Sequence, residues 1–359
     1  MKKIKSAASV FLVLVMILTC FTGCQSKEDN TTNLTNKRST EATKNVYDYI
    51  CNITGDGIIS GQQETYKRSD PDFEMNYIYD ASGKYPALRG LDFITSDYDE
   101  DADRTRFDDY QAVVDRATEW WNKGGLVTIC WHWGAPPDTY GYEASKRSTD
   151  IDQLLTEGSD LYKSMIKDMD EIAVYLKKLQ EAGVPVLWRP LHEFDGKWFW
   201  WGQGTPEQFV ELWKIMYDRY TNYHKLNNLI WVLGYTSSVK ADYYPGDEYV
   251  DIAGMDLYST KLPVNGYKKV YEVVEDRKPI CFHECETIPS PDELKEKEVN
   301  FVWFLNWHTN KLTECNTNEH IKEVYTSDYV VTLDELPDFN NYERASTTCT
   351  TPTTNDMKK

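Results

Sequence analysis

Residues 185–235 read PVLWRPLHEFDGKWFWWGQGTPEQFVELWKIMYDRYTNYHKLNNLIWVLGY. The apolar runs that open and close this stretch, 185–193 and 228–235, are nearly continuous rather than alternating, as in strands buried on both faces. Between them, residues 207–225 carry apolar side chains at three- and four-residue intervals, which predicts an amphipathic helix. Thr205, followed by Pro, Glu and Gln, is typical of a helix start. The stretch therefore predicts a strand, a helix and a second parallel strand.

The same pattern recurs along the chain, where apolar runs bounded by turn signals alternate with stretches of helical spacing. The eight runs are residues 58–64, 86–93, 126–133, 185–193, 228–235, 251–258, 278–284 and 300–308. The helical stretches include residues 106–122, 160–182, 207–225 and 267–276. Because the composition does not change between these runs, we predict one (β/α)8 TIM barrel of α/β class over residues 45–338, not a split doubly wound sheet.

The first 24 residues predict an export signal. Lysines at positions 2, 3 and 5 precede the apolar run 7–21, which is shorter than a membrane-spanning helix requires. The run ends in Phe21-Thr22-Gly23-Cys24, which resembles a bacterial lipobox with Phe in place of the usual Leu. We therefore predict a lipoprotein signal peptide, a lipid on Cys24 and a place on the extracellular face of a bacterial membrane. Ordinary cleavage nearby, with release of a secreted protein, is the alternative.

Two polar segments flank the predicted barrel. Residues 25–44 are rich in Ser, Thr and Asn and contain almost no apolar side chains, and residues 339–359 have the same character. Because such segments bury too little apolar surface to fold, we predict a disordered tether and a low-complexity tail.

The charge of the chain limits its partners. Its formal net charge of −19 repels phosphate backbones, so we expect no nucleic-acid partner and favour a neutral or cationic substrate. We also expect the protein to be a monomer. Aromatic residues make up 14% of the chain, including 12 Trp and 25 Tyr. Such rings line sugar-binding sites but also fill ordinary cores, and their number alone does not separate the two uses.

Two glutamates end runs that face each other across the predicted barrel mouth, where such barrels carry their catalytic groups. Glu193 ends the fourth run and Glu284 ends the seventh. Glycosidic hydrolysis needs one carboxyl to protonate the leaving oxygen and a second carboxylate on the other side of the sugar. A separation of about 5 Å would give retention of configuration. The alternative is that one glutamate is only a structural ion-pair partner.

The sequence around both glutamates resembles glycoside hydrolase family 26, whose members are mostly β-mannanases. The resemblance is carried by residues 187–202, LWRPLHEFDGKWFWWG, and 278–289, KPICFHECETIP, with shorter matches at Trp131 to Pro136, Tyr244 to Asp247, Asp256 to Tyr258 and Trp307-His308. It implies a (β/α)8 fold, a retaining mechanism without a metal, Glu193 as acid/base (proton donor) and Glu284 as nucleophile. The chain departs from the family at Glu286-Thr287, where Gly-Pro is common, and so places a third carboxylate near the site.

Six neighbouring side chains are candidates for binding substrate. His192 can orient Glu193 or bind the sugar, and Tyr258 can donate a hydrogen bond to Glu284. Trp307 can stack on a pyranose ring and Trp198 can line the leaving-group subsite. The fifth and sixth candidates, which we expect to contact the sugar upstream of the scissile bond, are His132 and Trp133. Each could instead be a wall or core residue, and the Trp200-Trp201 pair fits either use.

No metal or other cofactor is predicted. The cysteines after the signal show no C-x2-C spacing, and their disulfide pairing cannot be read from the sequence. The first run ends in Gly61-Gln62-Gln63-Glu64 and lacks the His-x-His pair that a metal-dependent barrel hydrolase would carry.

The resemblance thus implies cleavage of β-1,4-mannosidic bonds in mannan, glucomannan or galactomannan. It also covers β-1,3-1,4-glucanases and β-1,3-xylanases, which remain alternatives, as does a surface lipoprotein that binds glycans without cutting them. Endo and exo action depend on loop geometry and stay open.

Overall fold

The computed structural model describes residues 33–65, 70–95, 105–137 and 139–345. The predicted signal peptide with Cys24, residues 25–32 of the predicted tether and residues 346–359 of the predicted tail lie outside the described residues. In the part that is described, no helix has the length and hydropathy needed to cross a membrane.

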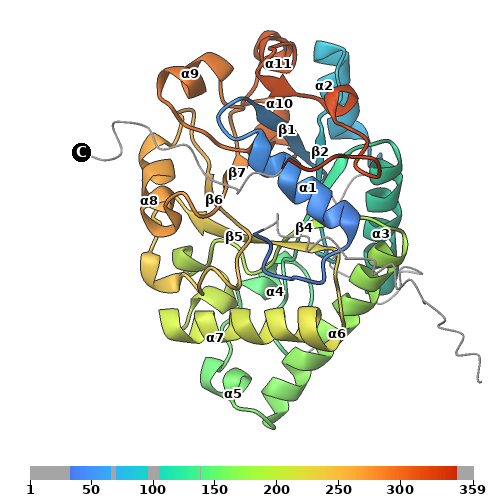
Figure 1. Ribbon diagram of the computed structural model, residues 1–359. Coiled ribbons are helices and arrows are strands. Elements are labelled where there is room, and N and C mark those ends of the chain that lie inside the picture. The colour runs from blue at the N-terminus through green and yellow to red at the C-terminus, as the bar shows by residue number, and fades with distance from the viewer. Residues whose placement is uncertain (1–32, 66–69, 96–104, 138, 346–359) are drawn as a thin grey trace, which may run out of the picture. The chain divides into compact units, whose positions relative to one another are not determined.

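Eight parallel strands close into a barrel with helices on its outside (Figure 1). The strands are β1 Ile58–Gln63, β2 Leu88–Asp92, β3 Leu126–Cys130, β4 Val186–Arg189, β5 Leu229–Thr236, β6 Ile252–Leu257, β7 Ile280–Cys285 and β8 Trp303–Asn306. Each strand pairs with the next, and β8 pairs with β1. A short strand, β9 Val330–Val331, adds to β1. The predicted (β/α)8 TIM barrel is confirmed.

The helices that follow the strands form the outer layer. The longer ones are α2 Phe73–Ser82, α3 Arg106–Asn122, α6 Asp160–Glu181, α7 Pro206–Tyr217, α8 Val264–Val274 and α11 Asn318–Tyr325. Shorter helical segments are α4 Tyr142–Ser145, α5 Ile151–Leu155, α9 Pro291–Glu296, α10 Asn310–Thr313, η1 Phe194–Gly196, η2 Trp200–Gly202, η4 Ala241–Tyr243 and η5 Leu333–Glu335. The helix start predicted at Thr205 is present as a capping box with Gln208. A π-helix, η3 Asp218–Tyr223, continues α7.

The strands that carry the predicted site end earlier than the apolar runs suggest. The run 185–193 forms a strand only to Arg189, and the run 300–308 forms one only to Asn306. Pro190 follows β4 and has no N–H to donate to the sheet. His192, Glu193 and Trp307 therefore lie on loops that leave the barrel at its carboxyl end.

The N-terminal segment corrects the predicted boundary of the tether. Residues 33–44 lie against the barrel, where Leu34 is buried and the Thr35 N–H donates to the Asp251 carboxylate at 2.6 Å. Thr40 caps helix α1, Glu41–Asn52, which crosses the barrel in Figure 1. The composition rule failed because the polar side chains of this segment make specific hydrogen bonds and caps instead of facing water.

The predicted tail also begins too early. Phe339 is buried against Tyr49 of α1 and stacks on Trp121 of α3 at a centroid distance of 5.9 Å. Arg344 donates to Glu41 at 2.9 Å. Residues 339–345 therefore belong to the folded unit.

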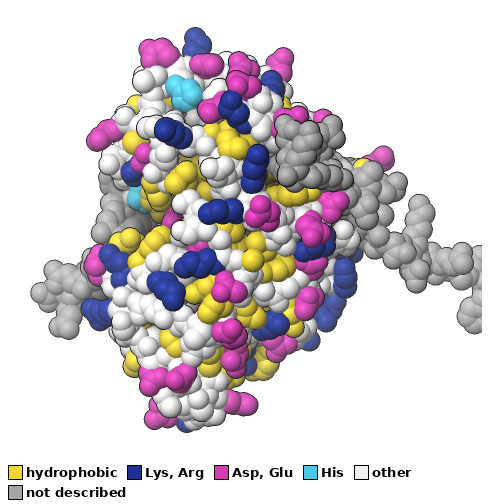
Figure 2. All heavy atoms as spheres, turned by 90° about the vertical axis from the view of Figure 1, so that its left-hand side faces the viewer, with side chains coloured by type: hydrophobic (Ala, Val, Ile, Leu, Met, Phe, Trp, Pro, Cys, Tyr) yellow, Lys and Arg dark blue, Asp and Glu magenta, His cyan; other side chains and the backbone are white. Residues whose placement is uncertain are grey.

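Most of the tryptophan rings stabilise the core. The fully buried ones are Trp188, Trp200, Trp201, Trp213, Trp231 and Trp303. The Trp200-Trp201 pair is thus core, which answers the question that the sequence left open. On the face shown in Figure 2, acidic and basic side chains are interspersed among apolar ones and form no broad basic area.

Candidate active site

A cleft of about 590 Å³ opens at the carboxyl end of the barrel. It is lined by Thr65, Asp92, Ile94, His132, Tyr142, Glu193, Phe199, Tyr258, Glu284 and the β8 loop from Trp307 to Lys311. A second lobe of about 350 Å³ contains Trp198 and Asp256. The two lobes share Tyr142, Glu193 and Tyr258, so these three side chains mark the junction where an extended ligand would pass from one lobe to the other.

The backbone around Glu193 adopts an unusual conformation that aims its side chain at this junction. Leu191 and Glu193 have positive φ values of 50° and 54°, which non-glycine residues rarely adopt. The Glu193 N–H donates to the carbonyl of Gly234 in β5 at 2.8 Å and so fixes the turn. Backbone conformations of this cost are typical of functional sites.

A bulge in β7 brings Glu284 beside Asp256. The register of β7 against β6 shifts after Met255, so that Asp256 pairs with Glu284 and His283 is the additional residue. Bulges commonly redirect a side chain next to an active site. One carboxylate oxygen each of Glu193, Asp256 and Glu284 lies within 4.8 Å of the other two. Glu193 and Glu284 are therefore close neighbours, and the limit is compatible with the separation that we expected.

Arg189 connects two of these carboxylates. Its guanidinium donates to Asp256 at 2.7 Å and to Glu284, and all three side chains are buried. The predicted hydrogen bond from Tyr258 is also present, since its hydroxyl donates to the second oxygen of Glu284 at 2.5 Å. Two donors thus hold the Glu284 carboxylate, one on each oxygen.

Sequence reasoning did not assign Arg189 or Asp256 to the site. A signal was available, because a guanidinium within an apolar strand of a closed barrel must be paired with carboxylates. Tyr142, Phe199 and the residues after Trp307 were also missed, and they stand on loops whose path carries no periodic pattern.

The environment of Glu193 favours its protonated form. Burial, followed by the negative charge of Glu284, raises the pKa of Glu193 to about 8. The Arg189 charge and a hydrogen bond from the Trp198 indole N–H, at 2.9 Å, act in the opposite direction but are smaller. At neutral pH Glu193 therefore keeps its proton, while Glu284 accepts hydrogen bonds from Arg189 and Tyr258.

His132 and His192, both predicted to bind substrate, form a line of side-chain contacts with Asp92. The Asp92 carboxylate accepts from His132 Nδ1 at 2.5 Å, and the His132 and His192 Nε2 atoms lie 3.2 Å apart. Burial lowers the pKa of His192 well below its usual range, with a smaller contribution from Arg189. For His132, burial lowers the pKa, but the charge and hydrogen bond of Asp92, together with the charges of Glu284 and Glu193, raise it above its usual value. His132 lines the cleft, whereas His192 lies behind it and makes its contact through His132.

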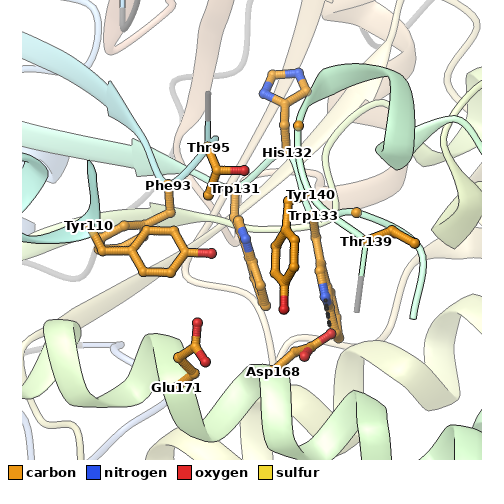
Figure 3. Close-up of a pocket in the computed structure, with 12 residues that line it drawn as sticks. Phe93, Thr95, Tyr110, Trp131, His132, Trp133, Thr139, Tyr140, Asp168 and Glu171 are labelled. Atoms are coloured by element: carbon orange, nitrogen blue, oxygen red, sulfur yellow. Dashed lines mark hydrogen bonds between the residues drawn. The ribbon is translucent and has the colours of Figure 1, made fainter. Parts of the chain in front are cut away.

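Trp133 does not reach the cleft, contrary to our expectation. Its ring is 2% exposed, stacks on Trp131 at 4.3 Å and donates to Asp168 of α6 at 3.1 Å. Figure 3 shows both indoles pointing away from the His132 ring. Because side chains of an extended segment alternate in direction, His132 and Trp133 cannot both face the same cleft.

The remaining predicted residues lie at the cleft. Trp307 lines the larger lobe, and Trp198 lines the smaller lobe with 42% of its surface exposed. The Glu286 carboxylate is 2.7 Å from the ammonium of Lys311, so this third acid is part of an ion pair at the edge of the site. Of the cysteines, Cys51 is disulfide-bonded, while Cys130, Cys281, Cys285 and Cys315 are free thiols.

Comparisons with known proteins support the same chemistry. The family model of glycosyl hydrolase family 26 matches residues 35–335. A mannan endo-1,4-β-mannosidase of Thermothelomyces thermophilus is 36% identical over 85% of this chain and 63% of its own length. Mannan endo-1,4-β-mannosidase B of Piromyces sp. is 33% identical over 87% of this chain and 55% of its own length. The chain thus spans about half to two thirds of these relatives.

Two solved structures extend the likeness. The GH26A protein of Muricauda sp. has 34% identity and a TM-score of 0.76, covering 84% of this chain and all of its own. A β-mannanase from a symbiotic protist of the termite Reticulitermes speratus, complexed with a gluco-manno-oligosaccharide, has 31% identity and a TM-score of 0.76. That alignment covers 86% of this chain and 98% of the protist chain.

We predict that the Glu193 carboxyl titrates near pH 8. The substitution Glu284→Gln should lower the pKa of Glu193, because it removes a neighbouring negative charge and leaves the burial of Glu193 unchanged. The measurement is carbon NMR of labelled glutamate carboxyls, with Glu193→Gln used to assign the signal. Glu286→Gln is the control and should leave the titration in place. A wild-type titration near the ordinary value of about 4.3 would contradict the prediction.

Proposed function

The chain belongs to glycosyl hydrolase family 26, and from this membership we propose that it hydrolyses β-1,4-mannosidic bonds of mannan-type polysaccharides by double displacement. The observation that carries the proposal is the pair of close carboxyls at the carboxyl end of the barrel, where the pKa of Glu193 is raised to about 8 and the Glu284 carboxylate is held by two hydrogen-bond donors. A glycoside hydrolase with retention needs both features, because one carboxyl donates a proton while the other attacks carbon.

In the first step, an oxygen of Glu284 attacks the anomeric carbon while the bond from that carbon to the leaving oxygen breaks. The proton of Glu193 passes to the leaving oxygen, which departs as a hydroxyl of the released chain. In the second step, the Glu193 carboxylate takes a proton from water as the water oxygen attacks the same carbon and frees Glu284. Two inversions leave the configuration unchanged.

The neighbouring residues have separate tasks in this proposal. Arg189 and Tyr258 donate to the two oxygens of Glu284 and orient this carboxylate for attack. His132 and Trp307 face the sugar bound in the larger lobe. The leaving group occupies the smaller lobe, which Trp198 lines, and the indole N–H of Trp198 donates to Glu193.

The names of the relatives support mannan as the substrate, and a gluco-manno-oligosaccharide is bound in one structural neighbour. We expect the chain without its predicted signal, residues 25–359, to release reducing sugar from galactomannan and glucomannan. Barley β-glucan and β-1,3-xylan, tested in the same assay, should be poor substrates. Release from β-glucan or xylan alone would retain the mechanism and overturn the mannan assignment, and no release from any of the four would favour glycan binding without cleavage.

Replacement of the two glutamates should give different defects. Glu284→Ala should abolish turnover, and added azide should restore it with an inverted mannosyl azide as product, because azide attacks from the side that the carboxylate vacates. Glu193→Ala should lose about 10²- to 10⁴-fold on polysaccharide but retain activity on aryl mannosides with good leaving groups, which need no proton. Glu286→Gln should remain near wild type. Full activity on mannan in either alanine variant would refute the assignment.

We also propose that the protein is exported as a monomer and anchored through a lipid on Cys24, which the signal and the lipobox-like segment support. Cells grown with an alkyne-bearing fatty acid should label the wild-type protein but not Cys24→Ser. Unlabelled wild-type protein in the medium would instead indicate ordinary signal cleavage, and light scattering of the soluble form measures whether it is a monomer.

A further inference from the structure

A second hollow lies on the outer wall of the barrel along α6 and α7, the two helices drawn at the lower side of Figure 1. Its volume is about 1000 Å³, and none of its lining residues lines either lobe of the cleft. Side-chain contacts hold its walls in place. Gln208 of α7 donates to Asp152 of α5 at 2.6 Å, and Arg219 of the π-helix binds Asp170 of α6 through two hydrogen bonds.

Tyrosine rings form much of the wall. Tyr162, Tyr217, Tyr223 and Tyr249 all line the hollow, and Tyr217 and Tyr249 pack edge to face at 5.2 Å. Tyr223 is 63% exposed, the highest fraction among the large exposed hydrophobic residues in the described ranges. It ends the π-helix η3, an element that is rare and often marks functional sites. Together with the three other tyrosines of the wall, Tyr223 forms a contiguous aromatic surface, which is the kind that marks binding sites.

Cations support these rings from one side. The Arg219 guanidinium lies 3.7 Å from the centroid of the Tyr223 ring, and the Lys214 ammonium lies 4.8 Å from that of Tyr249. Such cation–π contacts restrain the rings at little cost in free energy. The tyrosine wall is therefore held in a defined orientation, which lowers the entropy lost when a ligand binds.

The charges of the hollow disfavour an anionic ligand. Five carboxylates line it against the two cations Lys214 and Arg219, and they belong to Glu157, Glu207, Glu211, Asp218 and Glu248. A polyanion would be repelled by this excess. Carboxylates beside aromatic faces suit polyhydroxylated chains, because the hydroxyls donate to the carboxylates and the apolar face of each sugar packs on a ring.

We propose that this groove is a second binding site for the neutral β-linked polysaccharide, separate from the catalytic cleft. The inference rests on the proposed function for the identity of the polymer. A chain much longer than the cleft can contact both sites, and the second contact keeps the enzyme on the polymer between cleavages by raising the effective concentration of scissile bonds. The groove should therefore matter for long substrates and not for short ones.

The test replaces the exposed ring on the full exported protein. Tyr223→Ala removes it, Tyr223→Phe keeps it, and the matched control Tyr79→Ala removes an exposed tyrosine on α2, far along the chain from the groove. Affinity electrophoresis through soluble galactomannan measures binding, and kinetics on galactomannan and on mannotetraose measure turnover. Thermal unfolding of each variant confirms that the fold is retained.

We expect Tyr223→Ala to show weaker retardation in the gel, because only the cleft still binds the polymer, and to raise KM for galactomannan about threefold to tenfold, with kcat and the mannotetraose kinetics unchanged. Tyr223→Phe and Tyr79→Ala should behave as wild type. Equal retardation and equal KM in Tyr223→Ala would overturn the proposal, as would an equal loss on mannotetraose. Failure of the proposed function gives a distinct result, because the wild type would then cleave neither mannan substrate.

Discussion

The Arg189 guanidinium lies between two carboxylates in the floor of the cleft, and the arrangement of the site depends on this buried ion triad. Removal of one partner from such a group costs about 3–5 kcal/mol, because it leaves a charge buried without compensation. The triad joins β4, β6 and β7, since Arg189, Asp256 and Glu284 stand on these three strands. Only a closed barrel places the ends of those strands around one point.

The same triad separates the roles of the two glutamates. The Glu284 carboxylate accepts from the Arg189 guanidinium and the Tyr258 hydroxyl, whereas the Glu193 side chain accepts from the Trp198 N–H and lies beside the negative charge of Glu284. The Arg189 charge also acts on Glu193, but burial and the negative charge of Glu284 outweigh it and raise the pKa of Glu193 to about 8. The two carboxyls therefore differ in their hydrogen-bond partners, and the direct contact with Arg189 belongs to Glu284.

Irregular backbone conformations position the Glu193 and Glu284 side chains in the cleft. The left-handed residues after β4 turn Glu193 into the cleft, and the bulge in β7 sets Glu284 opposite Asp256. Gly234 takes part as well, because a Cβ there would lie 3.1 Å from an Arg189 nitrogen. Tight packing around the strands compensates for the cost of these backbone conformations, with the fully buried indoles of Trp188 and Trp231 packed against Tyr220 and Trp213 of the helical layer.

The amino-acid pattern by itself specified the barrel, because each strand buried on both faces requires a continuous apolar run and each covering helix an apolar stripe. It also placed Glu193 and Glu284 at the mouth, since strand ends in such a barrel share one rim. Tertiary packing decided the rest. Trp133 turned inward because neighbouring side chains alternate, and residues 33–44 folded because their polar groups find partners far along the chain. The raised pKa of Glu193 is caused by burial and by the charge of Glu284, and both arise only after the strands have closed into a barrel.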